Sequence, residues 1–105
     1  MNHSRSKTRQ DALDAETVAI HALTFLAADL ERLERFLALT GLSPDEVRAA
    51  AGDPGFLAAV LEHTTQDETL LMTFSANAGI APEAIEAARI RLGRGHDPAR
   101  HYDGW

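Results

Sequence analysis

The segment Val18-Ala-Ile-His-Ala-Leu-Thr-Phe-Leu-Ala-Ala28 is the strongest structural signal in the sequence, because it is apolar on nearly every side when it is placed on a helix. Helices that are apolar all round are buried inside their protein. We therefore predict a central, mostly buried helix from about Leu13 to Ala28. Its polar side chains fall in a single stripe, since Thr17, His21 and Thr24 follow one another at helical spacing.

Five more helices follow this segment, each marked by a start or a stop signal. Asp29 and Ser43 are of the types that cap helix N-termini, and Gly41 is of the type that ends a helix in the left-handed conformation. Thr65 and Glu68 have the spacing of a capping box, which predicts a helix start at Thr65. The predicted helices run from Asp29 to Thr40, with Leu30, Leu33, Phe36 and Leu37 buried, from Ser43 to Ala51, from Asp53 onward, from Thr65 to Gly79, and from Pro82 to Gly93.

No part of the sequence indicates a β-strand, because alternating β-branched and aromatic runs are missing while Ala, Leu, Glu and Arg predominate. We therefore predict an all-α protein, a compact bundle of about six short helices. Two helical hairpins in it share a pattern at a spacing of 38 residues, as an internal repeat would. The matched positions are Asp29 with Asp67, Leu33 with Leu71, Phe36 with Phe74, Gly41 with Gly79 and Pro44 with Pro82.

The composition excludes several classes of protein. Of the 105 residues, 45% are hydrophobic and 25% are charged, which is the balance of a folded globular domain. No apolar run approaches the length of about 18 residues that a membrane-spanning helix needs. Cysteine is absent, which excludes disulfides, thiolate metal sites and cysteine nucleophiles.

Charge divides the chain into three parts. Residues 1–10 carry three basic and no acidic side chains, residues 11–92 carry fourteen acidic residues against five arginines, and residues 93–105 are neutral. We predict a disordered basic N-terminal arm over 1–10, a single helical domain over 11–92 and a flexible C-terminal tail over 93–105. The arm lacks the apolar stretch of a secretion signal, so we expect a cytoplasmic protein.

The net charge of −6 argues against nucleic acid as a partner, because contact with phosphates needs a positive surface. Contact through the basic arm is the weaker alternative. Its three positive charges release about three counterions, too few for useful affinity at physiological salt.

Three stretches of the chain resemble a known family. They are Phe25-Leu-Ala-Ala-Asp29, Arg35-Phe-Leu-Ala-Leu-Thr-Gly-Leu42 and Asp53-Pro-Gly-Phe-Leu-Ala-Ala-Val-Leu61, and residues 67–74 and 82–89 continue the likeness. Together they make the chain similar to the bacterial domain-of-unknown-function family 3572. The resemblance implies a cytoplasmic protein of an alphaproteobacterium and supplies no activity and no site residues. The chain departs from it at residues 63–65, His-Thr-Thr, where members of the family tend to be apolar.

One cluster is a candidate for metal binding or hydrolysis. His63 and Asp67 lie four residues apart, and Glu62 precedes the histidine. Such a site needs converging groups, whereas a helix break is expected between His63 and Asp67. The alternative interpretation is that His63 ends one helix and Asp67 begins the next, where both suit the helix dipole. We therefore assign no catalytic, cofactor-binding or metal-binding residue and expect a protein that is not an enzyme.

Three residues are candidates for contact with a partner. His21 lies on the polar stripe of the first helix, and the tail holds Tyr102 and Trp105, aromatic types that are favoured in interfaces. We hypothesise a small interaction or adaptor protein that binds another protein. The alternatives are a metal- or ligand-binding or hydrolytic protein that uses the cluster around His63, and a homodimer formed through the apolar surface of the first helix.

Overall fold

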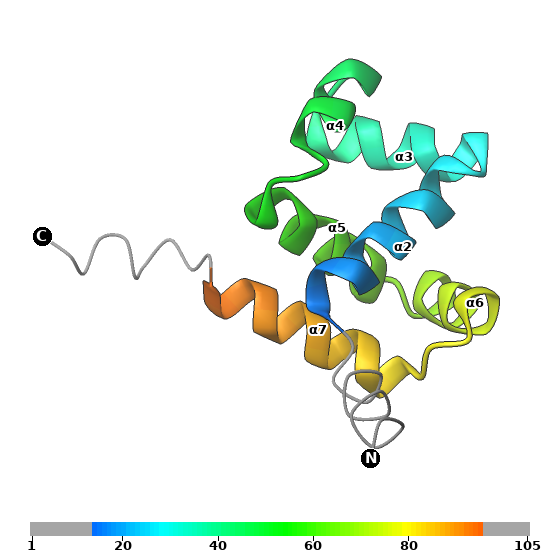
Figure 1. The fold of residues 1–105 in the computed structure, drawn as a ribbon. Helices are drawn as coiled ribbons and strands as arrows, with labels where there is room; N and C mark the ends of the chain where they lie inside the picture. Colours follow the sequence, from blue (N-terminus) through cyan, green and yellow to red (C-terminus); the bar gives the residue numbers. More distant parts are fainter. Residues whose placement is uncertain (1–13, 96–105) are drawn as a thin grey trace, which may run out of the picture.

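The computed structural model describes residues 14–95, and nearly all of this part of the chain is α-helical. The six helices (Figure 1) are α2 (Ala15–Ala27), α3 (Leu30–Thr40), α4 (Pro44–Ala50), α5 (Pro54–Gln66), α6 (Glu68–Ala78) and α7 (Pro82–Gly95). No strand occurs between residues 14 and 95, so the predicted all-α bundle is confirmed. None of these described helices is long and apolar enough to cross a membrane.

Helix α2 is the centre of the bundle, and it contacts α3, α5, α6 and α7. It crosses in front of α5 and reaches down to α7, while α4 lies at the far edge beyond α3 (Figure 1). Val18, Ala22 and Leu26 are fully buried along its inner face. The predicted central position of the helix is therefore confirmed, but the helix is less buried than predicted, since Ile20 is 47% exposed and Ala27 and Ala28 at its end are exposed as well.

Two aromatic contacts join the outer helices to the inner ones, α3 to α5 and α6 to α2. Phe36 of α3 packs edge-on against Phe56 of α5, with ring centroids 6.0 Å apart. Phe74 of α6 packs against Phe25 of α2 at 5.3 Å. Phe36 and Phe74 are fully buried, and pairs of this kind contribute about 0.5–1.5 kcal/mol beyond the burial of their area.

The two predicted helical hairpins share their end structures. The carboxylates of Asp29 and Asp67 each accept a backbone N–H three residues later, and Gly41 and Gly79 have φ angles of 76° and 70°. The likeness between the two hairpins is limited to these helix ends. The structure does not confirm an internal repeat, because α7 packs along α2 and α5 whereas α4 stays at the edge of the bundle (Figure 1).

Three local predictions were wrong. Leu30 is 70% exposed, because it is the first residue of α3 and its side chain lies outside the helix interface. The start of α6 is capped by Asp67 instead of Thr65, whose hydroxyl donates to the carbonyl of Leu61 inside α5. Helix α7 continues to Gly95, since Gly93 does not take the positive φ of a helix-ending glycine.

The predicted basic arm over 1–10 lies outside the described residues. The same holds for Tyr102 and Trp105 in the tail. These assignments stay predictions.

Candidate functional site

The polar stripe of α2 forms one side of a surface groove of about 600 Å³. The α2 groove, as we name it, is lined by Thr17, Ile20, His21 and Thr24 from α2, by Arg32 from α3 and by Asn77 from α6, and its other lining residues are the apolar Phe25, Ala28 and Ala78. The predicted candidate His21 is thus exposed and lies in a hollow formed by three helices.

The free polar groups of this groove include both hydrogen-bond donors and acceptors. The hydroxyl of Thr17 donates a hydrogen bond to the Asp14 carboxylate at 3.1 Å, and the hydroxyl of Thr24 donates one to the Ile20 carbonyl at 2.9 Å. The imidazole of His21 and the carboxamide of Asn77 make no side-chain hydrogen bond to any other described residue. None of the described residues that line the groove is acidic. The groove therefore offers both hydrogen-bond donors and acceptors, and its described lining carries no negative charge of its own.

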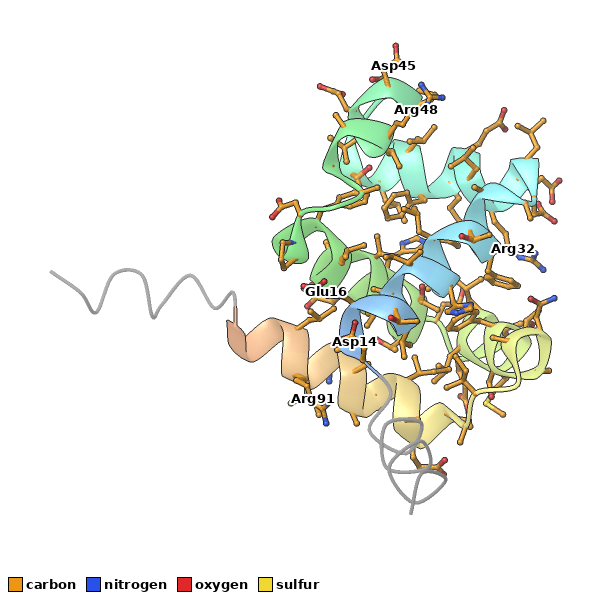
Figure 2. The ribbon with its side chains drawn as sticks, in the orientation of Figure 1. Asp14, Glu16, Arg32, Asp45, Arg48 and Arg91 are labelled. Carbon is orange, nitrogen blue, oxygen red and sulfur yellow. The ribbon has the colours of Figure 1, made fainter. Side chains whose placement is uncertain are left out.

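A second hollow, of about 220 Å³, lies on the other side of Arg32, which lines both. The α3–α6 pocket, as we name it, is lined by Glu31, Arg32 and Arg35 from α3, by His63 from α5, and by Asp67 and Leu70 at the start of α6. Figure 2 shows Arg32 at the side of the molecule where α3 approaches α6, far from Arg48 and Arg91.

Arg32 lines both hollows, and two contacts hold its guanidinium in place. Its Cζ atom lies 4.4 Å from the ring centroid of Phe25, which is a cation–π contact. Its Nη1 atom lies 3.5 Å from a carboxylate oxygen of Asp29, and the side chains of both are only partly exposed. These contacts keep a positive charge fixed at the boundary of the groove and the pocket.

His63 is the half-buried titratable group of the α3–α6 pocket. Its ring lies edge-on against Phe36, with centroids 5.0 Å apart. Burial lowers the pKa of His63 below its ordinary value of 6.5, the guanidinium of Arg35 lowers it further, and the carboxylate of Asp67 opposes both. At neutral pH the ring is therefore uncharged and offers one donor and one acceptor nitrogen.

The predicted cluster of Glu62, His63 and Asp67 does not form one site. His63 and Asp67 line the same pocket, but Glu62 is exposed outside it. Helix α5 continues through Gln66, so the helix break lies at Asp67 itself, which is the C-cap of α5 and caps α6 through its bond to the backbone N–H of Leu70. Among residues 14–95, no three His, Asp or Glu side chains are placed to hold a metal ion.

Sequence reasoning missed the arginines and Asn77. Arg32 follows Phe25 by seven residues, a spacing that would place them on one face of a continuous helix. The chain breaks at Ala28 and Asp29, so their contact depends on the angle between α2 and α3. Asn77 reaches the groove from a helix more than fifty residues later, and no local pattern signals it.

Comparison with known proteins identifies the family of the chain but no activity, ligand or partner. No curated protein and no solved structure matches the chain significantly. Residues 12–95 match the model of the family described as "Protein of unknown function (DUF3572)". This match covers the whole described part of the chain and the greater part of its full length. The chain therefore belongs to the DUF3572 family.

Proposed function

We propose that the protein is a small interaction module without catalytic activity, which binds another protein through the α2 groove in the cytoplasm of a bacterial cell. The observation that carries this proposal is the groove, which brings the exposed Ile20 together with the unengaged polar groups of His21 and Asn77.

The make-up of the groove supports a protein partner. Protein interfaces combine an apolar centre with polar groups at the rim. Ile20 supplies an exposed apolar contact, and His21, Asn77 and Arg32 supply hydrogen-bond donors around it. A partner segment that places an apolar side chain beside a carbonyl or carboxylate oxygen fits this arrangement.

The other hollow supports a role without catalysis. General acid–base chemistry uses paired groups whose environments push their pKa values apart, commonly by burial. In the α3–α6 pocket His63 is half-buried, but the carboxylate-bearing residues Glu31 and Asp67 are both exposed. Asp67 is also engaged as a helix cap.

The test is affinity capture by the tagged full chain from its native lysate, followed by mass spectrometry. Ile20→Glu places a charge in the groove. Ile90→Glu is the matched control, because Ile90 is 43% exposed, close to the 47% of Ile20, and lies on α7 outside the groove. Circular dichroism checks that both variants keep the fold.

We expect Ile20→Glu to reduce recovery of the partner by about tenfold or more, because it buries a charge at an apolar contact. Ile90→Glu should recover as much as the wild type. Equal recovery by both variants would contradict the proposal. Recovery of only a second, differently tagged copy of this chain would show a homodimer instead.

The C-terminal residues have a separate test. A chain that ends at Gly95 keeps all six described helices and lacks Tyr102 and Trp105. We predict that it recovers less partner than the full chain, because the two aromatic side chains add contact. Unchanged recovery would remove the tail from the binding surface and leave the groove proposal intact.

A further inference from the structure

We propose that the α3–α6 pocket binds a small zwitterion of the size of a free amino acid with an apolar side chain. This site is separate from the α2 groove and does not depend on the function proposed for it. The pocket of about 220 Å³ is several times larger than the roughly 30 Å³ that one water molecule takes up in the liquid. It therefore has room for a small organic ligand.

The positive part of the site is on α3. Arg35 lines the pocket, and among the described residues it has no ion-pair partner. Arg32 lies beside it and is held in place by Asp29 and the ring of Phe25. A guanidinium matches the two oxygens of a carboxylate, so the free Arg35 is the natural partner of the ligand's carboxylate.

The carboxylates in the lining of the same pocket favour a zwitterion over a simple anion. Glu31 has no ion-pair partner within residues 14–95, and Asp67 uses Oδ1 to accept the backbone N–H of Leu70, which leaves Oδ2 for a ligand. A simple anion would face these two carboxylates, and a simple cation would face the arginines. A ligand that carries both charges pairs with each.

The remaining walls are apolar or neutral. Leu26 is fully buried and Leu70 is half-buried, and both line the pocket. The ring of His63 is fixed against Phe36 and gives one rigid side. An aliphatic side chain packs against the exposed parts of Leu70 and His63, which makes a leucine-like molecule a better fit than glycine.

The test is ¹H–¹⁵N NMR of the full chain with three probes that share the aliphatic side chain of leucine. They are L-leucine, 4-methylpentanoate, which lacks the ammonium, and 3-methylbutylamine, which lacks the carboxylate. We expect leucine to shift the amides of Thr69, Leu70 and Thr73 with a dissociation constant of about 1 mM or tighter. The affinity for each single-charge probe should be lower than that for leucine by about tenfold or more, because one charged pairing is lost.

Variants separate the site from general effects of charge. Arg35→Gln should weaken leucine binding about tenfold or more. Arg48→Gln is the control, because Arg48 pairs with Asp45 on the exposed α4 (Figure 2) and should leave binding unchanged. No saturable shift up to about 10 mM leucine would overturn the proposal. Equal binding of the single-charge probes, or unchanged binding by Arg35→Gln, would also overturn it.

Discussion

Leu26 and Leu39 show how strongly the place of one side chain decides its effect on stability. Leu26 is fully buried on α2, whereas Leu39 is 69% exposed on α3. Leu26→Ala should lower the free energy of unfolding by about 2–5 kcal/mol, and Leu39→Ala should change it by about 0.5 kcal/mol or less. Urea denaturation of the two variants measures this, and similar losses would contradict the described core.

His63 makes the stability of the protein depend on pH. Its lowered pKa means that the folded state resists a proton that the unfolded state takes up near the ordinary value of 6.5. The free energy of unfolding should therefore fall as the pH falls through about 6.5, until the folded state is protonated as well.

The matched variant for this effect is His63→Gln. Its free energy of unfolding should decline less than that of the wild type between about pH 7 and pH 5, because the group that takes up the proton is gone. Above about pH 7.5 the two curves should run parallel, since His63 is then neutral in both states. Curves that stay parallel below about pH 6.5 would show that folding does not affect this imidazole.

Among the elements, the loop glycines have unequal roles. Gly79 ends α6 with a φ of 70°, whereas Gly52 has no positive φ and has open space around the position of a Cβ. Gly79→Ala should destabilise the fold by about 1 kcal/mol, because other residues are strained in the left-handed conformation. Gly52→Ala should be neutral or stabilise by up to about 1 kcal/mol. Thermal unfolding of both variants checks this, and a larger loss for Gly52→Ala would contradict it.

Most helix ends could be predicted from the sequence, because their signals are local. Asp29 and Gly41 act as predicted, since each satisfies backbone groups within a few residues of itself. The start of α6 could not be chosen in this way, because Thr65 and Asp67 are both capping types. Thr64 is fully buried, and its hydroxyl donates a hydrogen bond to the carbonyl of Val60. Helix α5 therefore continues past Thr64, and Asp67 caps the start of α6.

At the scale of the whole molecule, the central position of α2 was predictable and the two hollows were not. An apolar segment must be buried wherever its neighbours lie, so its sequence alone indicates its place. The α2 groove and the α3–α6 pocket depend on how α2, α3 and α6 meet around Arg32. His21 and the pair of His63 and Asp67 could be named beforehand, but their surroundings come from residues distant in the sequence.

The measurement that tests the proposed function most directly is site-specific photocrosslinking in the native cell. A photoreactive amino acid is placed at the position of His21 in the α2 groove, and in a second protein at the position of Ile90 on α7. We predict a covalent adduct to one other protein from position 21 and none from position 90. The same adduct from both positions, or no adduct from position 21, would contradict binding through the groove.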